Sequence, residues 1–439
     1  MKKWLAIVFV LAGFASAKAQ SVYTNLFVEN NLAETVSRID LSENRIWNNV
    51  FTTGNVPNQI QVKGDSLYIL NSVSSTLQIV DLNTGKEVNT IDLGAHKNPW
   101  NFTFCKSSGL IFVSNLMANS VSVVDLQKGT VVDSISVGTA PEGILAVGKK
   151  VYVTNTAFDA VTFSYGQGSV FVIDAPSRTV VDTILTPTNP QNLAVDSDGR
   201  LHVVCTGNFA NLSGSVLVVD LSTNSVVDTV KIGGSPSTIA FGANGVAYLG
   251  AGGWGSHGNV LAYNAQTLAI LHGADHPIQT GAGVMDVLAD GEGHIFAAAF
   301  KEDRVDVIDT QVDSVVKSFA VGDGPGSLAL WKTTVSRVVE HKAENKRPRQ
   351  FVLEQNYPNP VCVRSAQGIR FSFQLSQEDN VVLSVYNVLG QKMLDLAAGK
   401  FSAGRHVIEA NLDRFGSGLY FYRLKTSRGI QVRKLVVTP

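Results

Sequence analysis

Short strand-like runs alternate with polar turns along most of the chain, and almost no segment repeats its apolar residues with the period of a helix. One five-residue run of apolar and β-branched residues recurs at intervals of about 44 residues. Each copy precedes a run that ends in Asp or Asn, then a turn rich in Ser, Thr, Asn and Gly, then two more runs separated by a Gly/Pro turn. The copies are LFVEN (26–30), LYILN (67–71), IFVSN (111–115), VYVTN (151–155), LHVVC (201–205), VAYLG (246–250) and IFAAA (295–299).

Seven units of four short strands predict an all-β fold, and a seven-bladed β-propeller is the architecture that covers both faces of such strands. The first unit lacks one strand, and the segment SLALW (327–331) is left over at the end of the last unit. We therefore expect 327–331 to pair with 26–30 and close the ring, because an open ring would expose a strand edge. A two-sheet sandwich is the structural alternative, and the sevenfold repetition disfavours it.

The repeat resembles the YVTN family of β-propellers, which includes YncE-like periplasmic proteins and archaeal surface-layer proteins. The literal sequence YVTN occupies 152–155, and 111–147 match the longer family pattern of a strand ending in Asn, V-x-V-x-D, VV-x-T-I and G-x-x-P-x-G-I. The resemblance covers residues 26–331. It implies the propeller fold and leaves function open, because one such scaffold carries many different sites.

A second pattern of alternating strands follows a polar segment, 332–350, that contains six Lys or Arg. It predicts a small immunoglobulin-like β-sandwich with strands at 369–375, 380–387, 406–412, 418–425 and 430–437.

This part of the chain resembles the C-terminal sorting domain of type IX secretion substrates. The matching pieces are LEQNYPNP (353–360), VYNVLGQKM (385–393) and GSGLYFYRL (416–424), followed by RKLVV (433–437). The resemblance implies that residues 351–439 engage the type IX secretion machinery, and that the propeller is released or held at the cell surface.

Residues 1–19 have the three parts of a secretory signal peptide. Lys2 and Lys3 are basic, 4–14 are apolar, and Ala17-Lys18-Ala19 precede a cleavage point at Gln20. No later segment is long and apolar enough to span a bilayer, so we expect no transmembrane segment. The expected organisation is a signal peptide (1–19), a propeller (20–331), a linker (332–350) and a sorting domain (351–439).

The overall net charge of −1 hides an asymmetry. Residues 20–331 contain 15 Lys and Arg against 28 Asp and Glu, whereas 332–439 contain 17 against 8. The acidic propeller would repel backbone phosphates, so we expect no nucleic-acid partner. Three cysteines are too few for a disulfide framework.

Several short motifs suggest chemistry and have a simpler structural explanation. GAGGWGSHG (250–258) contains G-x-G-x-x-G, but strands on both sides replace the helix that a dinucleotide fingerprint needs. DSDG (196–199) and DGEG (290–293) fall between consecutive strands, where Asp-Gly forms hairpin turns. We expect the Asp and Asn residues at strand ends to cap turns. The histidines of the sixth unit lack the spacing of a metal site, so the sequence predicts no metal. Because the other motifs have structural explanations, it also predicts no catalytic residue and no cofactor.

Three consecutive units carry insertions in the same loop. The spacing from the five-residue run to the acid or amide of the next strand is ten residues in units 1, 2, 3 and 7, but 19, 15 and 14 in units 4, 5 and 6. The inserted loops are 156–168, 206–214 and 251–258, and in a propeller they share a face with the turns that enter the innermost strands.

Aromatic residues mixed with amides and glycines on long loops are typical of ligand recognition, and the alternative is that these loops only pack on one another. The candidate ligand-binding residues are Phe158, Phe163, Tyr165, Phe209, Trp254 and His257 on the loops, and Trp100, Gln191, Asn192, Met285 and Asp286 in the entering turns.

Two classes of function remain open. One is a non-catalytic binding module for a small molecule, a glycan or a protein, and the resemblance adds capture of cobalamin or another nutrient at the outer membrane as one version. The other is a propeller enzyme, such as a lyase, a glycosidase or a quinoprotein dehydrogenase, with His, Glu, Asp or Arg at the channel mouth. The turns offer mostly Asn, Gln, Trp, Gly and Ser, with Glu142 and Asp286 as exceptions, which favours binding. Convergence of these two carboxyls with a histidine would instead favour an enzyme.

Overall fold

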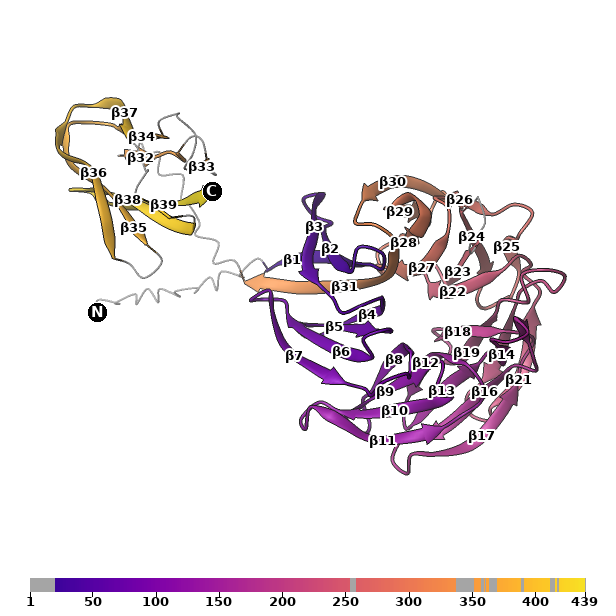
Figure 1. Ribbon diagram of the computed structural model, residues 1–439. Coiled ribbons are helices and arrows are strands. Elements are labelled where there is room, and N and C mark those ends of the chain that lie inside the picture. Colours follow the sequence, from indigo (N-terminus) through magenta and orange to yellow (C-terminus); the bar gives the residue numbers. More distant parts are fainter. Residues whose placement is uncertain are drawn as a thin grey trace, which may run out of the picture. The chain divides into compact units, whose positions relative to one another are not determined.

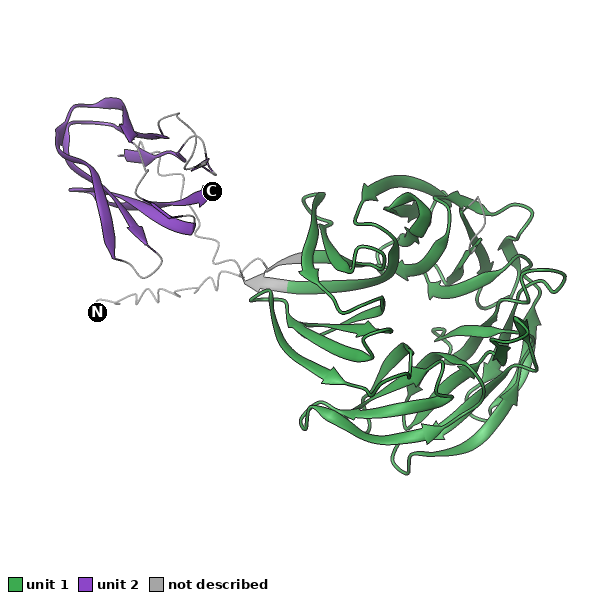
Figure 2. Cartoon of the chain, viewed as in Figure 1, with its two compact units in different colours: residues 1–337 green, residues 338–439 purple. Residues whose placement is uncertain are grey.

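The computed structural model describes residues 20–252, 258–336, 351–356, 359, 361–362, 369–387, 391–410, 415–416 and 418–438. Within them the chain forms strands β1 to β39 and one short 3-10 helix, η1 (Phe300–Glu302), so the expected all-β class is confirmed (Figure 1). The chain divides into two compact units, residues 1–337 and 338–439 (Figure 2). No helix among the described residues has the length and apolarity needed to cross a membrane.

Unit 1 consists of antiparallel sheets of the kind that build β-propellers, and each is named here after its innermost strand. The β31 sheet has β3 (Arg45–Thr52), β2 (Thr35–Asp40), β1 (Gln20–Asn30) and β31 (Pro325–Ser336). The β4 sheet has β4 (Pro57–Lys63), β5 (Ser66–Asn71), β6 (Thr76–Asp81) and β7 (Lys86–Asp92). The β8 sheet has β8 (Pro99–Cys105), β9 (Leu110–Asn115), β10 (Ser120–Asp125) and β11 (Thr130–Ser136). The β12 sheet has β12 (Pro141–Val147), β13 (Lys150–Asn155), β16 (Ser169–Asp174) and β17 (Thr179–Leu185).

Three further sheets complete the ring of unit 1 in the described residues. The β18 sheet has β18 (Pro190–Val195), β19 (Arg200–Cys205), β20 (Ser215–Asp220) and β21 (Ser225–Val230). The β22 sheet has β22 (Pro236–Phe241), β23 (Val246–Ala251), β24 (Gly258–Asn264), β25 (Ile270–His272) and β26 (Ile278–Thr280). The β27 sheet has β27 (Val284–Ala289), β28 (His294–Ala299), β29 (Arg304–Asp309) and β30 (Ser314–Ala320). Each innermost strand packs beside the next, in the order β4, β8, β12, β18, β22, β27, β31 and back to β4, which makes a closed ring.

The ring closes through the two ends of unit 1, as the leftover segment 327–331 predicts. β31 pairs antiparallel with β1, so that Leu330 lies opposite Leu26 and Leu328 opposite Val28. The pairing runs on to Ser336 opposite Gln20, so the first residues of the expected linker (332–350) belong to this strand. The remaining linker residues and the signal peptide lie outside the described residues.

Side chains on both faces of the sheets are buried between neighbouring sheets. Leu26 and Val28 of β1 pack against Phe296 of the β27 sheet, whereas Phe27 of the same strand packs against Ile60 of the β4 sheet. Alternation along one strand therefore places successive side chains in two different inter-sheet cores. This is why the inner strands are apolar at consecutive positions.

In the β22 sheet the repeated strand is shifted by one residue from the position that the sequence indicates. Pro236 lies opposite Ala251, as Pro141 lies opposite Asn155 and Pro190 opposite Cys205. The repeat in this sheet is therefore 247–251 and not 246–250. Its loop insertion is one residue shorter than the sequence spacing indicates, because Ala251 belongs to the strand.

The expected turn caps are confirmed for the seven Asp and Asn residues that end the second runs. Their carboxylate or amide oxygens accept backbone N–H groups two or three residues later at 2.7–3.2 Å. They are Asp40, Asp81, Asp125, Asp174, Asp220, Asn264 and Asp309.

The turn-capping role expected for Asn30, Asn115 and Asn155 is wrong, because their Oδ1 atoms accept no hydrogen bond, whereas Asn71 Oδ1 accepts the Gly54 N–H of the turn that enters β4 at 3.1 Å. Their buried carboxamides donate to hydroxyls of the neighbouring strand, as Asn115 Nδ2 does to Ser122 Oγ at 3.0 Å. They also pack against the turn that enters the innermost strand. A Cβ at Gly322 would lie 2.5 Å from the Asn30 amide nitrogen, so only glycine fits there.

Unit 2 has two sheets around one core. One contains β32 (Phe351–Leu353), β34 (Ile369–Leu375) and β37 (Gly404–Ala410). The other contains β33 (Val361–Cys362), β39 (Gly429–Thr438), β38 (Gly418–Thr426), β35 (Asp379–Asn387) and β36 (Lys392–Phe401). Phe371 of the first sheet meets Tyr422 of the second with ring centroids 4.9 Å apart. β36 is not among the strands that the sequence predicts, because KMLDLAAGKF has no β-branched residue; it forms as an edge strand on β35.

Candidate functional site

The long loops lie at the edge of the sheets where the innermost strands begin. Loop 156–168 leaves β13 after Asn155, opposite the start of β12, and loop 206–214 leaves β19 after Cys205, opposite the start of β18. The expected shared face of loops and entering turns is confirmed in these two sheets. Within loop 156–168, β14 (Phe158–Asp159) and β15 (Ser164–Tyr165) form a hairpin that is separate from the β12 sheet.

Aromatic side chains from these two loops form one cluster. Phe158 and Tyr165 face each other across the hairpin with ring centroids 5.2 Å apart, and Phe163 lies edge-on to Phe158 at 6.2 Å. Tyr165 is 6.4 Å from Phe209 on loop 206–214. We call these four residues the aromatic cluster. It joins the long loops of two neighbouring sheets, and all four members are among the candidate residues of the sequence analysis.

Two members of the cluster are both exposed and strained. The side chains of Phe163 and Phe209 are 79% and 53% exposed. Their φ angles of 52° and 58° lie in the left-handed region, which bulky residues rarely adopt. The Asn208 carboxamide holds the second loop in this shape by accepting the N–H of Leu212 at 2.8 Å. Turn residues such as Val56 and Ala140 have similar φ angles, and what distinguishes Phe163 and Phe209 is that they present large apolar rings to water.

A cavity of about 400 Å³ opens beside Phe209, between the β18 and β22 sheets. Its volume lies within the range of small-molecule sites. It is lined by Phe209, Gly234, Ser235, Ala251, Gly252, Asn259, Leu261 and Ala274. Phe209 therefore contributes to the aromatic cluster on one side and to the cavity on the other.

The other described candidates lie outside the aromatic cluster, and most have contacts of their own. The Trp100 carbonyl accepts Asn58 Nδ2 at 2.6 Å, and Asn192 Oδ1 accepts the neighbouring backbone N–H at 2.7 Å. Gln191 Oε1 accepts Thr206 Oγ1 at 2.9 Å, and Met285 is 38% exposed. No ring contact of the described residues joins Trp100 to the aromatic cluster. Trp254 and His257 lie outside the described residues.

Glu142 and Asp286 are the carboxyls of the innermost strands β12 and β27. Burial raises the pKa of Glu142 to about 8. Burial also raises the pKa of Asp286 to about 6. The Leu328 N–H and the Thr238 hydroxyl each donate to this carboxyl at 3.0 Å and act in the opposite direction, lowering the pKa. Within the described part of the chain, no hydrogen bond or ion pair joins Glu142 to Asp286, or either of them to a histidine.

Glu29 is a buried carboxyl that the sequence analysis did not single out. Its Oε2 accepts the Ser327 N–H at 3.1 Å, and burial, with a further effect of Asp286, holds its pKa well above the usual range. In the β8 and β12 sheets the hydroxyls of Ser114 and Thr154 accept the equivalent N–H groups. In the sequence, the sign of this residue is that Glu29 stands in LFVEN (26–30) at the position where the other repeats have Ser, Thr or an apolar residue.

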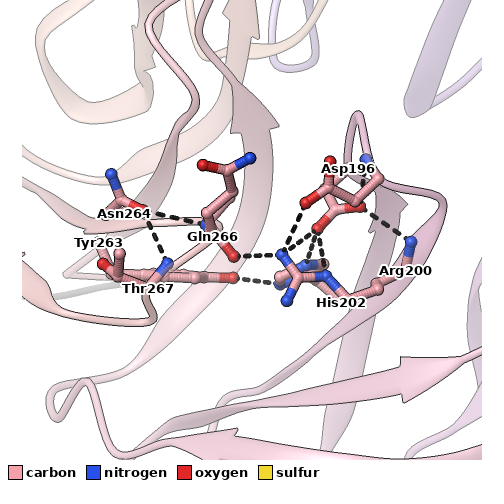
Figure 3. A network of polar contacts seen from close by, with 9 residues as sticks. Asp196, Arg200, His202, Tyr263, Asn264, Gln266 and Thr267 are labelled. Carbon is pink, nitrogen blue, oxygen red and sulfur yellow. Dashed lines mark hydrogen bonds and ion pairs between the residues drawn. The ribbon is translucent and has the colours of Figure 1, made fainter.

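A buried polar network links the β18 and β22 sheets at their opposite edge (Figure 3). His202 is fully buried; its Nε2 lies 3.0 Å from Asp196 Oδ2 and its Nδ1 2.6 Å from the Tyr263 hydroxyl. Arg200 bonds Asp196 and reaches the Ala265 carbonyl at 2.6 Å. Burial lowers the pKa of His202 despite the nearby Asp196, which favours the neutral ring. Because His202 and Asp196 are buried, we interpret this network as a structural link.

Asp196 also closes the expected DSDG turn by accepting the Asp198 and Arg200 N–H groups at 3.0 and 2.8 Å. Asp290 of DGEG accepts the Glu292 and His294 N–H groups in the same way. The described residues contain no group of three or more His, Cys, Asp or Glu placed to hold a metal ion.

The C-terminal part of the chain matches a family model. The model of a secretion system C-terminal sorting domain matches residues 355–438. This confirms the sorting domain expected from the sequence and indicates export by type IX secretion to the cell surface or the extracellular space. No curated protein sequence matches the chain.

Solved structures resemble the fold at low sequence identity. A chain of Kuenenia stuttgartiensis hydrazine synthase has a TM-score of 0.51 and 19% identity, over 65% of this chain and 96% of that chain. A chain of a mitotic checkpoint complex has a TM-score of 0.50 and 12% identity, over 62% and 80%. Apo AztD from Citrobacter koseri has a TM-score of 0.47 and 12% identity, over 72% and 100%. At such identities the likeness of the first two concerns the β-propeller-like fold alone.

Proposed function

We propose that this protein is an exported seven-bladed β-propeller of the YVTN, YncE-like type that binds a ligand on its long-loop face without chemical conversion. Each of the sheets named after an innermost strand is one blade. The chain is organised as a signal peptide (1–19), the propeller (20–331), a linker (332–350) and an immunoglobulin-like sorting domain (351–439) that hands the propeller to the type IX secretion machinery. The closed order of innermost strands and the family match of the tail support this organisation.

The observation that carries the binding proposal is the pair of exposed phenylalanines, Phe163 and Phe209, held in the left-handed backbone region. Both belong to the aromatic cluster, and the cavity of about 400 Å³ extends from Phe209 toward the β22 sheet. Rigid aromatic rings bury a large contact area at low entropic cost, which is why they dominate recognition energy. A ligand with an apolar ring face and polar edges would suit the aromatic cluster and the cavity beside it.

The arrangement of the carboxyls supports binding over catalysis. Glu142 and Asp286 each have a local structural environment, and Asp286 is engaged by the neighbouring strands through Thr238 and Leu328. A propeller enzyme would bring such groups together around a reacting atom. Asp286 does act on the buried carboxyl of Glu29, but within the described residues no histidine bonds Glu142 or Asp286, which favours a binding module.

The experiment compares affinities of the full chain for a panel of glycans, corrinoids and secreted proteins. We expect at least one probe to bind, and Phe209→Asn to weaken that binding by about 30-fold or more, the size of an interface hot spot. Asn tolerates the left-handed region, so the substitution removes the ring without adding backbone strain. Met117→Asn is the matched control, because Met117 is 61% exposed and follows Asn115 on the corresponding short loop of the β8 sheet.

The melting temperature distinguishes a binding ring from a packing ring. We expect Phe209→Asn and Met117→Asn to melt within a few degrees of the wild type, because both side chains are exposed. A full chain that binds no probe, or a Phe209→Asn variant with unchanged affinity, would contradict the proposed site.

A further inference from the structure

The cavity beside Phe209 lies where other sheets of the ring carry a side chain. In the β31, β4, β8 and β12 sheets an asparagine faces the proline that begins the innermost strand, and its amide donates to the hydroxyl opposite it on the next strand at 3.1–3.3 Å. A Cβ at Gly138, three residues before Pro141, would lie 2.6 Å from the carboxamide carbon of Asn155. This carboxamide therefore fills the space beside the turn that enters β12. The four asparagines are Asn30, Asn71, Asn115 and Asn155.

The β18 and β27 sheets fill the same place with other side chains. In the β18 sheet the corresponding residue is Cys205, which is buried. In the β27 sheet it is Ala299, and Arg304 lies opposite it on the next strand. A Cβ at Gly281, in the entering turn, would lie 2.9 Å from Arg304 Nε. The longer side chain thus occupies the space that alanine leaves.

The β22 sheet leaves this place open. Ala251 stands where other sheets have asparagine, and Asn259 lies opposite it on the next strand. Both residues line the cavity of about 400 Å³. A Cβ at Gly233, which corresponds to Gly138, would lie closest to the Cβ of Ala274 at 3.1 Å, with neither Ala251 nor Asn259 within 4 Å. The cavity is therefore the space of a side chain that this sheet lacks.

An interrupted outer strand adds a further wall. In the described residues the outer strands of the other sheets, β3, β7, β11, β17, β21 and β30, each run without a break for six to eight residues. In the β22 sheet this strand is divided into β25 and β26, with residues 273–277 between them. Ala274 of this segment lines the cavity. The missing side chain and the divided strand thus occur together in one sheet.

The walls of the cavity are held together by the backbone. Gly214, at the end of the loop that carries Phe209, donates its N–H to the Gly234 carbonyl at 2.8 Å and accepts the Gly233 N–H at 3.1 Å. A Cβ at Gly214 would lie 2.2 Å from Pro236 Cδ, so only glycine permits this approach. The loop and the entering turn are therefore joined in both directions, and a ligand would not have to order them.

The residues that line the cavity are uncharged, and two of them offer polar side chains. Asn259 Oδ1 accepts Gln279 Nε2 at 3.5 Å, a long hydrogen bond. Within the described part of the chain, neither Asn259 Nδ2 nor the Ser235 hydroxyl takes part in a hydrogen bond. A carboxamide presents a donor and an acceptor side by side, which is complementary to two adjacent hydroxyls. A charged ligand would find no opposite charge here, and burying an unpaired charge is costly.

We propose that this cavity binds an uncharged sugar ring at the end of a glycan, with two adjacent hydroxyls on the Asn259 carboxamide and a C–H face on Phe209. This inference rests on the proposed binding function and names its ligand class. The volume lies near the lower end of the range for small-molecule sites, which suits a terminal ring. Phe209 is the one aromatic residue among those that line the cavity, and a sugar ring needs a single aromatic wall for its apolar face.

The test titrates the full chain with the methyl glycosides of glucose, galactose and mannose, followed by the NMR signals of the sugar. These probes differ in the orientation of their adjacent hydroxyls, and we expect at least one of them to bind. Tetrahydropyran-2-methanol keeps the ring but lacks the adjacent hydroxyls, so it should bind at least tenfold more weakly. The uronic acid of the sugar that binds should also be at least tenfold weaker, because its carboxylate finds no cation.

Ala251→Asn is the sharpest variant, because it restores the side chain that the other sheets carry. It should fill the cavity and weaken sugar binding at least tenfold. The melting temperature should change by no more than a few degrees, since Gly233 leaves room for a carboxamide as Gly138 does. Ala33→Asn is the matched control, because Ala33 is exposed in the turn between β1 and β2, and it should leave the affinity unchanged.

Asn259→Leu tests the hydrogen bonds without filling the cavity. Leucine is similar in size to asparagine and has no polar atom, so sugar binding should weaken at least tenfold. This variant also keeps the inference testable if Ala251→Asn does not fold. Unchanged affinity in Asn259→Leu would contradict the contact between the carboxamide and the hydroxyls.

The outcomes separate this inference from the proposed function. Failure of all three glycosides to bind, or unchanged sugar affinity in Ala251→Asn, overturns the sugar site even if Phe209→Asn still weakens the binding of another probe. Equal affinity for the uronic acid overturns the assignment to an uncharged ring. Binding of adenosine in place of the glycosides, lost in Ala251→Asn, overturns the assignment to a sugar. Sugar binding that depends on Ala251 but survives Phe209→Asn contradicts the proposed role of the aromatic cluster instead.

Discussion

The backbone N–H of Ser327 donates a hydrogen bond of 3.1 Å to the carboxyl of Glu29, and so joins the last strand of unit 1 to the first. The same two strands are paired along their length, and their side chains enter the core shared with the β27 sheet. One sheet thus holds both ends of the ring. Its stability should decide whether the whole ring stays closed.

Leu328→Ala should weaken this closure. Leu328 is 4% exposed and packs in the core with Leu26 and Val28. Removing a buried leucine side chain costs about 2–5 kcal/mol, so the free energy of unfolding in urea, followed by tryptophan fluorescence, should fall by that amount. Val316→Ala, at a residue 54% exposed on β30, should change it by less than about 0.5 kcal/mol. Equal effects of the two substitutions would argue that β31 does not hold the ring.

Glu142 should make the stability of unit 1 depend on pH. Burial raises its pKa from 4.5 to about 8, so the folded state keeps a proton that the unfolded chain releases between these values. Stability therefore falls as the pH rises from about 4.5 to about 8, by up to about 1.4 kcal/mol per pH unit, and is constant outside this window.

Glu142→Gln tests this dependence, because glutamine is neutral at every pH. Urea titrations between pH 5 and pH 9 should show a smaller loss of stability for the variant than for the wild type. Asp286 and Glu29 add effects of the same sign in both proteins, so only the difference between the two curves is informative. Glu43→Gln on the surface is the control, and a Glu142→Gln curve parallel to the wild type would refute the prediction.

Tyr263→Phe should destabilise the protein although it removes one oxygen atom. The fully buried His202 would lose its partner at Nδ1, and an unpaired buried group costs about 1–3 kcal/mol. Tyr152→Phe is the control, because its hydroxyl donates to the half-buried Asn224 Oδ1, which keeps Lys150 Nζ as a second donor, so the loss should cost less than about 1 kcal/mol. The free energies of unfolding of the three proteins at pH 7 provide the measurement, and similar losses for both variants would count against the network.

The same network predicts sensitivity to acid. Burial lowers the pKa of His202 below 6.5, so the unfolded chain gains a proton at a higher pH than the folded protein. Stability should therefore fall as the pH drops through about 6.5 and below. His202→Gln should reduce this acid-side loss in the same urea titrations, and an unchanged slope would mean that other groups cause it.

Removal of residues 351–439 should stop export and leave unit 1 folded. The sorting-domain match covers 355–438, and the two units are separately compact. Cell fractionation should find the truncated chain in the periplasm, whereas the full chain reaches the surface or the medium. Val432→Ala, at a residue 46% exposed in β39, should be exported normally. Truncated chain outside the cells, at the level of the full chain, would show that the tail is dispensable.

The sequence by itself determined the features that depend on local pattern and on counting. Alternating β-branched runs located the repeating strands of unit 1, and the spare segment 327–331 identified the closing strand, because strand number and chain order decide which edge is left unpaired. The Asp caps were readable because they bond backbone groups two or three residues away. The sorting motifs were readable because export signals are recognised as sequence.

Only the tertiary structure decided what segments from different sheets do together. The register of the β22 sheet depends on which residue Pro236 faces, and the hairpin β14–β15 forms where no repeat predicts a strand. Tyr165 contacts Phe209, and His202 contacts Tyr263, across spacings that do not match the repeat. The burial of Asn189 is likewise not visible in the sequence pattern. Such contacts follow from how neighbouring sheets pack, and a pattern along a single strand does not specify that packing.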